Sequence, residues 1–128
     1  MTTVGLVVDA DALLGYASGS ELIGMLIAKT ADAGQSVVIP AISLAEAYRS
    51  VDSTGFRYLD IVVTLPWVDV APLDHELCLF VGGWSRTMGL ELAHAAVEAS
   101  SFPEALFATS RRELVTRYLP KEWPIVDL

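Results

Sequence analysis

The 128-residue sequence has only one cysteine, Cys78, so it contains no pair for an internal disulfide or a cysteine-based metal site. It has no apolar stretch of the roughly 18 uninterrupted residues that a membrane helix requires. The segment that begins the sequence lacks the basic start of a secretory signal. We therefore expect a cytoplasmic protein with no membrane association. Because Cys78 falls within the apolar stretch 77–81, its thiol is predicted to be buried.

Basic residues are scarce. Eight lysines and arginines stand against 16 acids, which gives a formal net charge of −8. Such a charge repels nucleic acid unless a metal ion or a local basic patch offsets it. The basic residues that come close together are all near the C-terminus: Arg111, Arg112, Arg117 and Lys121.

Several common catalytic motifs are absent as well. The pair Gly82-Gly83 lacks the strand and lysine of a phosphate-binding loop. No serine lies in a nucleophile-elbow sequence, which argues against serine hydrolase chemistry. The three tryptophans do not alternate with basic residues, so packing explains them better than base stacking.

Short apolar runs alternate with helical patterns along the chain, which predicts βα units and a parallel sheet. Strands are expected at 4–8, 36–39, 67–71, 105–108 and 125–126. Helices are expected at 12–16, 21–33, 43–51, 55–65, 74–88, 91–100 and 112–119. Hydrophobic residues make up 53% of the sequence, enough for a sizeable core, and no linker divides it. The prediction is one α/β domain over residues 1–128.

Acidic residues follow the first two predicted strands. Asp9 and Asp11 come after the run 4–8, and Glu46 lies shortly after the second strand. Ligands in open α/β sheets gather beyond the carboxyl ends of the strands, and Mg²⁺ or Mn²⁺ prefers carboxylate oxygens there. If the two strands are neighbours, the three acids converge into a candidate metal site.

Helix capping is the alternative for each acid. Asp9 or Asp11 can cap a short helix over 12–16. The sequence from Ser43 to Glu46 fits a capping box, in which Glu46 turns back to the start of its helix.

A second candidate group is Glu91, His94 and Glu98, whose spacing places them on one helix face. This face can offer metal ligands or be the solvated side of an amphipathic helix, and the solvated side is the favoured interpretation.

The order of these segments resembles the PIN-domain family, the small metal-dependent nucleases that include VapC-type toxins. The segments VVDADALLGY and IPAISLAEAYRS are similar to the first two family motifs and place Asp9 and Glu46 at the family's first two acids. The segment GLELAHAAVEAS resembles the third motif, FATSRREL with Thr109 resembles the fourth, and WPIVDL resembles the last edge strand. The resemblance implies a three-layer PIN-like fold, with a central parallel sheet of about four to five strands flanked by helices.

The chain departs from the family pattern in three respects. His94 replaces the third acid, Ser110 and Arg111 stand where a further acid follows Thr109, and Asp11 is an additional acid. An imidazole suits Mn²⁺ better than Mg²⁺. The guanidinium of Arg111 can instead pair with Asp9 or Glu46, or bind a substrate phosphate.

Three hypotheses follow. The first, implied by the resemblance, is an endoribonuclease that uses a metal-activated water, and the toxin of a toxin–antitoxin pair is the form of it that the resemblance suggests. Asp9, Glu46 and His94 would be catalytic, Asp9, Asp11 and Glu46 would bind Mg²⁺ or Mn²⁺, and Thr109 and Arg111 would contact RNA. A small antitoxin-like protein and a second copy of the chain would be its partners. The second is a catalytically degenerate PIN-like module for protein binding or dimerisation. The third is a small-molecule binder or hydrolase that uses the same crevice.

Overall fold

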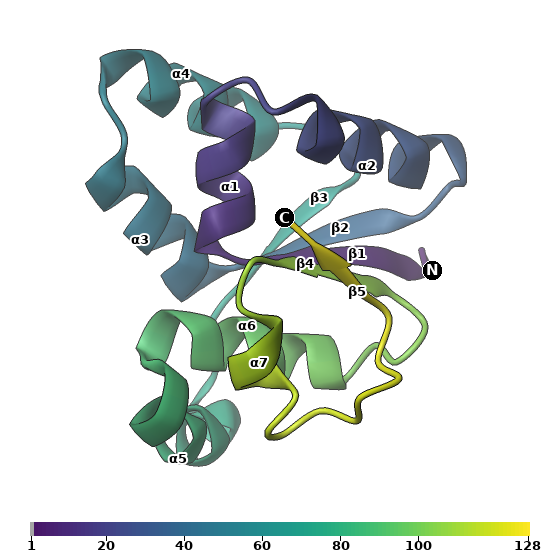
Figure 1. The fold of residues 1–128 in the computed structure, drawn as a ribbon. Helices are drawn as coiled ribbons and strands as arrows, with labels where there is room; N and C mark the ends of the chain where they lie inside the picture. The colour runs from purple at the N-terminus through teal and green to yellow at the C-terminus, as the bar shows by residue number, and fades with distance from the viewer. Residues whose placement is uncertain (1) are drawn as a thin grey trace.

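A five-stranded sheet forms the middle layer of the molecule. In the computed structural model, which describes residues 2–128, the strands pair in the order β3-β2-β1-β4-β5, and every pair is parallel (Figure 1). The strands are β1 (Val4–Val8), β2 (Ser36–Pro40), β3 (Val68–Ala71), β4 (Leu106–Thr109) and β5 (Ile125–Asp127). This confirms the predicted parallel sheet, including its weakly indicated last strand.

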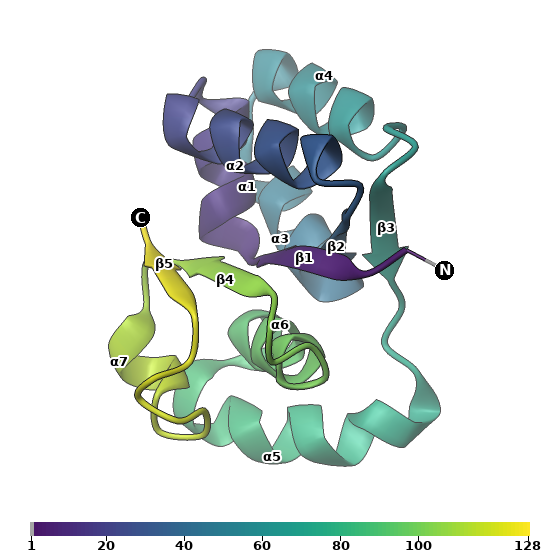
Figure 2. The ribbon, with the colours of Figure 1, turned by 90° about the vertical axis from the view of Figure 1, so that its right-hand side faces the viewer.

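Helices cover both faces of the sheet, so the three-layer α/β architecture is confirmed. The helices are α1 (Ala10–Ala17), α2 (Glu21–Asp32), α3 (Ala41–Ser50), α4 (Ser53–Val62), the 3₁₀ turn η1 (His75–Leu77), α5 (Cys78–Met88), α6 (Leu90–Ser100) and α7 (Arg112–Val115). Figure 2 shows α1 to α4 on one side of the sheet and α5 to α7 on the other. Within residues 2–128, none of these helices has both the length and the apolarity needed to span a bilayer.

The central strand β1 contributes to two separate hydrophobic cores. Leu6 and Val8 pack in the core beneath α1 to α4, whereas Val7 packs in the core beneath α5 to α7. All three side chains are at most 1% exposed. A strand that is buried on both faces consists of an unbroken run of apolar residues. For this reason the sequence predicted the bounds of β1 correctly.

Helix α3 begins two residues earlier than its predicted start. Pro40, the last residue of β2, is the N-cap of α3, and its backbone is extended with φ −63° and ψ 136°. Ser43 therefore lies inside the first turn, and the predicted capping box is wrong. The strand passes directly into the helix, which leaves no loop in which Ser43 could act as the cap.

Two further expectations about helices require correction. Cys78 is exposed rather than buried, because it is the first residue of α5 and the residues that this helix buries are Val81 and Met88, in its later turns. Helix α7 ends at Val115, short of the predicted 112–119.

The topology brings several chain segments to one edge of the sheet. The carboxyl ends of the adjacent strands β2, β1 and β4 lie there, and α3 and α1 begin directly beyond β2 and β1. The start of α6 reaches the same edge, because the first-turn residue Glu91 accepts a hydrogen bond from the backbone N–H of Ala10. The candidate site is built where these segments meet.

Candidate functional site

Asp9 lies at the carboxyl end of β1, and its side chain is fully buried. Its Oδ1 accepts a hydrogen bond from the Ala12 backbone N–H at 2.9 Å, which confirms that Asp9 caps α1. Its Oδ2 accepts a hydrogen bond from the Thr109 hydroxyl at 2.6 Å. Burial raises the pKa of Asp9 above its usual range, and the hydrogen bonds and the nearby charge of Arg111 offset only part of this rise.

Arg111 places its guanidinium among three carboxylates. Its Nη2 donates to Asp9 Oδ2 at 2.9 Å and to Glu91 Oε2 at 2.7 Å. Its Nε lies 3.2 Å from Asp11 Oδ2 without hydrogen-bond geometry, so this contact is one of charge alone. Burial opposes the positive charge, but the hydrogen bonds and charges of Glu91 and Asp9 outweigh it and raise the pKa of Arg111. We call these four residues the Arg111 cluster.

Glu91 is the member of the cluster that joins the most segments. Its Oε1 accepts from the Ala10 backbone N–H at 2.6 Å and from the Ser43 hydroxyl at 3.1 Å. Its Oε2 accepts from Arg111, so one carboxylate connects α1, α3, α6 and the loop after β4. The sequence analysis placed Glu91 with His94 and Glu98 and did not associate it with Asp9. The sequence feature that could have predicted its role is the position of Glu91 in the first turn of α6, which begins at the edge of the sheet where β2, β1 and β4 end.

His94 lies one turn further along α6 and is completely buried. Its Nδ1 accepts from the Ile42 backbone N–H at 3.4 Å, and its Nε2 lies 3.4 Å from Glu98 Oε1 without a hydrogen bond. The favoured solvated-face interpretation of this helix is therefore wrong, because α6 packs between the sheet, α3 and α5 and buries most of its side chains. The polar contacts of His94 are to Ile42 and Glu98 rather than to Asp9.

Glu46 lies on the wall of the same cavity as the Arg111 cluster. This cavity of about 460 Å³ is lined by Asp11, Glu46, Glu91 and Arg111 together with apolar side chains. The carboxylate of Glu46 is bound by the guanidinium of Arg49, whose Nε donates to Oε2 at 3.0 Å. The hydrogen bond from Arg49 lowers the pKa of Glu46. The structure thus brings Glu46 toward Asp11 across a cavity, but its charge is already paired at the rim.

These residues do not fit a divalent metal in the observed arrangement. Over residues 2–128, no three histidine, cysteine, aspartate or glutamate side chains are positioned to hold a metal ion. Arg111 lies between Asp9, Asp11 and Glu91, where a shared cation would have to bind. A second cation in this position would be repelled by the guanidinium at close range.

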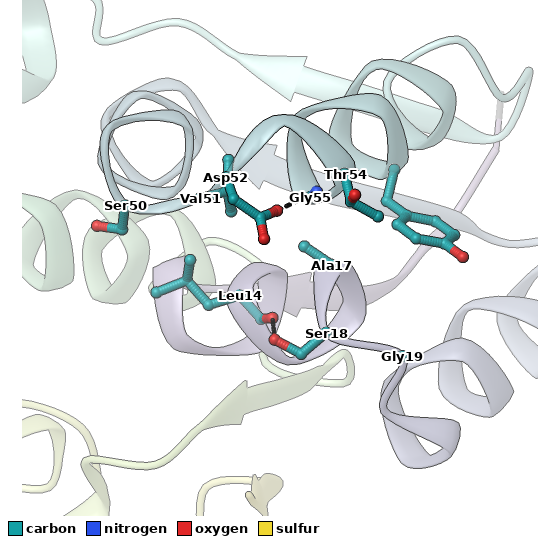
Figure 3. A pocket seen from close by; sticks show the side chains of 10 residues that line it. Leu14, Ala17, Ser18, Gly19, Ser50, Val51, Asp52, Thr54 and Gly55 are labelled. Carbon is teal, nitrogen blue, oxygen red and sulfur yellow. Dashed lines mark hydrogen bonds between the residues drawn. The ribbon is translucent and has the colours of Figure 1, made fainter.

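A larger cavity, of about 650 Å³, lies between α1, the end of α3 and the start of α4 (Figure 3). Asp52 is the one charged residue that lines it, and its carboxylate accepts from the Gly55 backbone N–H at 2.8 Å as the cap of α4. The other polar groups of the lining are hydroxyls and a tyrosine. This cavity lacks a cluster of catalytic groups, so the Arg111 cluster remains the candidate site.

Comparisons with known proteins agree with this architecture. No protein-family model matches the chain, and neither does any curated protein sequence. The chain is structurally similar to one in the crystal structure of VapBC2 from Rickettsia felis bound to a DNA fragment from their promoter, with a TM-score of 0.67 and 14% sequence identity. The similarity covers 96% of this chain and 98% of that one. The fold is PIN-like. At this level of identity, the similarity establishes the PIN-like fold and leaves the activity to be argued from the residues.

Proposed function

We propose that this chain is a PIN-like module of the toxin–antitoxin type that acts by binding a protein partner, with its strand-end carboxylates neutralised by its own Arg111. The observation that carries the proposal is the position of Arg111 Nη2, which donates to both Asp9 and Glu91. The similarity to a chain of VapBC2 supports a small antitoxin-like protein as the partner. A second copy of the chain is the other proposed partner.

The hydrogen bonds of the Arg111 cluster support this role over catalysis. Both oxygens of Glu91 and both oxygens of Asp9 accept hydrogen bonds from the protein. Carboxylates engaged in this way stabilise the junction of several helices, and the hydrogen bonds from Arg111 would have to be broken before a metal could bind between Asp9 and Glu91. The Arg111 Nη2 group is likewise engaged with carboxylates and is not presented to a phosphate.

A metal-dependent endoribonuclease is the second candidate. It is favoured by the convergence of Asp9, Asp11 and Glu91 on one point, with Glu46 on the wall of the same cavity. In this alternative, Arg111 would leave the carboxylates and contact RNA together with Thr109, while the acids would bind Mg²⁺ or Mn²⁺. His94 would have to act from its buried position in α6.

Calorimetric titration with Mn²⁺, combined with an RNA cleavage assay, distinguishes the two candidates. We expect no micromolar Mn²⁺ binding to the wild-type chain, and equal background cleavage by the wild type and the Asp9→Asn/Glu46→Gln variant. Asp69→Asn, an exposed substitution on β3, is the matched control for loss of negative charge. The proposal is overturned if the wild type binds Mn²⁺ and cleaves RNA, and the double variant does neither while Asp69→Asn does both.

The partner is tested by co-expressing the chain with the product of each small open reading frame found beside its gene. We expect a stable complex on size exclusion, and sedimentation of the chain alone reports whether it forms a dimer. A chain that purifies free of the co-expressed product and sediments as a monomer contradicts the partner-binding role.

A further inference from the structure

Helix α5 has an inner side that packs in the protein and an outer side that is exposed. Figure 2 shows α5 as the outermost helix on its side of the sheet, with α6 between α5 and the strands. Val81 and Met88 are buried, and Leu77 and Trp84 pack beside them in the core beneath α5 to α7. The helix therefore turns its opposite side to the solvent.

Four residues of the outer side form one row. Glu76, Leu79, Gly83 and Arg86 follow one another at intervals of three, four and three residues, which places them on the same face of a helix. Glu76 belongs to the turn η1, which leads into α5 through the helical backbone of Leu77 (φ −85°, ψ −15°). All four residues of the row are exposed. We call them the α5 row.

The middle of the α5 row combines a projection with a hollow. Leu79 is 79% exposed, more than any other large hydrophobic side chain of residues 2–128. Covering such a side chain removes apolar surface from water and is favourable. At Gly83, one turn further along, an added Cβ would meet no atom within 4 Å, so another helix can approach the backbone closely there. A helix that presents the same two residues in the reverse order fits both features.

The ends of the α5 row carry opposite charges. Glu76 lies at its start beside Asp74 and His75, whereas Arg86 is the single charged residue of α5 itself. Among residues 2–128, neither Glu76 nor Arg86 forms a salt bridge. Ten residues of helix separate them by about 15 Å, so they do not neutralise each other. Each is free to pair with a charge on another molecule.

The charges and the apolar residues of the row are complementary to a second copy of the same row. The midpoint between Glu76 and Arg86 is residue 81, and the midpoint between Leu79 and Gly83 is the same residue. A two-fold axis level with residue 81 relates two antiparallel copies of α5. In that register Leu79 of each copy lies on Gly83 of the other, and Glu76 of each copy faces Arg86 of the other. These two pairs of opposite charges act locally against the repulsion between two chains of net charge −8.

We propose that two copies of the chain pair through antiparallel α5 helices, with the α5 row of each copy on the α5 row of the other. The inference rests on the proposed function, in which a second copy is one of the two partners, and it assigns the surface and the register that this dimer uses. It involves none of the residues of the Arg111 cluster.

Sedimentation equilibrium of charge-reversed chains tests the pairing. The chain is measured at about 100 μM, because one short helix from each copy gives a contact at the small end of protein interfaces. We expect the wild type to dimerise. Glu76→Arg and Arg86→Glu should each weaken dimerisation about tenfold or more, since either one brings like charges together at both ends of the contact. An equimolar mixture of the two variants should dimerise within about threefold of the wild type, because opposite charges then meet at both ends again.

Two substitutions in the middle of the row test the apolar contact. Leu79→Ser should remove most of the dimerisation, and Gly83→Gln should weaken it by filling the space that Leu79 of the other copy occupies. Both positions are open to solvent in the single chain, so circular dichroism should show an unchanged fold.

The matched controls reverse exposed charges on the other side of the sheet. Asp32→Arg on α2 and Arg57→Glu on α4 change the net charge by the same amounts as the two α5 variants. Each should dimerise as the wild type does, and mixing them should give no further association. Equal weakening by the controls and the α5 variants would assign the effect to net charge and overturn the proposal.

The remaining outcomes separate this inference from the proposed function. The proposal is overturned if the wild type is monomeric, if the α5 variants remain dimeric, or if their mixture stays monomeric. A monomeric wild type that binds a co-expressed protein, and loses it with Leu79→Ser, would show that α5 binds that protein instead of a second copy, which overturns the α5 pairing alone. The proposed function is overturned separately, by Mn²⁺ binding and RNA cleavage, which the α5 variants should not alter because they leave Asp9 and Arg111 intact.

Discussion

Arg111 determines the chemistry of the candidate site at the scale of single residues. A fully buried carboxylate such as Asp9 needs either hydrogen bonds with a counter-charge or a proton. A guanidinium is permanently charged and planar, so it can serve two carboxylates through one nitrogen, as Nη2 does here for Asp9 and Glu91. Arg111, which stands where the resemblance to the PIN-domain family led us to expect an acid, thus neutralises Asp9 and Glu91 through an internal ion pair.

Replacing Arg111 by alanine should destabilise the protein by about 3 kcal/mol, because it leaves Asp9 and Glu91 without their counter-charge. Arg112→Ala is the matched control, since its salt bridge to Asp127 is solvent-exposed and should contribute at most about 1 kcal/mol. Urea unfolding measures both values. The double variant Arg111→Ala/Asp9→Asn should recover part of the loss, and strict additivity of the two single effects would argue against the pairing.

The raised pKa of Asp9 gives a pH dependence of defined sign. Between the ordinary aspartate pKa of about 3.9 and the higher native value, the folded chain holds a proton that the unfolded chain has released. The contribution of Asp9 to stability is therefore lost as pH rises through this window. The free energy of unfolding of the wild type minus that of Asp9→Asn should fall as the pH increases across it.

Asp127→Asn is the control with the opposite sign. The hydrogen bond from Arg112 lowers the pKa of Asp127, so its contribution to stability is lost as pH falls through the native pKa. The free energy of unfolding of the wild type minus that of Asp127→Asn should therefore rise with pH over the acidic range. Parallel behaviour of the two variants would show that the local environment of Asp9 is not as the structure has it.

The sequence predicted part of the site at this scale. It located Asp9 by its place after a buried strand and offered Arg111 as a partner for Asp9 or Glu46, of which the pairing with Asp9 is present. It did not connect Glu91 to Asp9, because Glu91 reaches the site through the backbone N–H of Ala10, 81 positions away, and through Arg111. Both contacts depend on the rotation of α6 about its axis. Nor could spacing alone show that His94, one turn away on α6, is buried.

At the scale of elements, the order of strands and helices was largely predictable and helix faces were not. Buried parallel strands such as β1 and β2 are unbroken apolar runs bounded by polar or turn residues, a pattern that depends little on the rest of the fold. The exposure of Cys78 depends on which side of α5 packs against α6, and the sequence of α5 alone does not determine that. The start of α3 was misplaced because Pro40 ends the strand and caps the helix at once.

Two glycines in helices should respond oppositely to alanine. A Cβ at Gly55, in the first turn of α4, would lie 2.8 Å from Val51 Cβ, so Gly55→Ala should destabilise the protein by about 1–3 kcal/mol. At Gly83, within α5, a Cβ would meet no atom within 4 Å, so Gly83→Ala should stabilise the protein by about 0.5–1 kcal/mol. Thermal unfolding of both variants tests the pair. Stabilisation by both substitutions would contradict the close approach of α4 to Val51.

At the scale of the whole molecule, one sheet separates two hydrophobic cores. Each core contains side chains from β1, which lies in the middle of the sheet, so neither core can lose its packing without exposing the strand that the other requires. This arrangement predicts that the described chain unfolds as one cooperative unit, and the single domain expected from the sequence remains a prediction that the same experiment tests.

The tryptophans report on the two cores separately and make this prediction testable. Trp67 packs against the core beneath α1 to α4, whereas Trp84 and Trp123 pack against the core beneath α5 to α7. In Trp84→Phe/Trp123→Phe the fluorescence comes from the first core, and in Trp67→Phe it comes from the second. In each variant the urea midpoint from fluorescence should coincide with that from circular dichroism, because both cores unfold with the shared sheet. If the fluorescence midpoint of either variant differs from the circular dichroism midpoint, the two helical layers unfold independently. The Arg111 cluster joins α1 and α3 of one layer to α6 of the other, so in that case it would open before the sheet does.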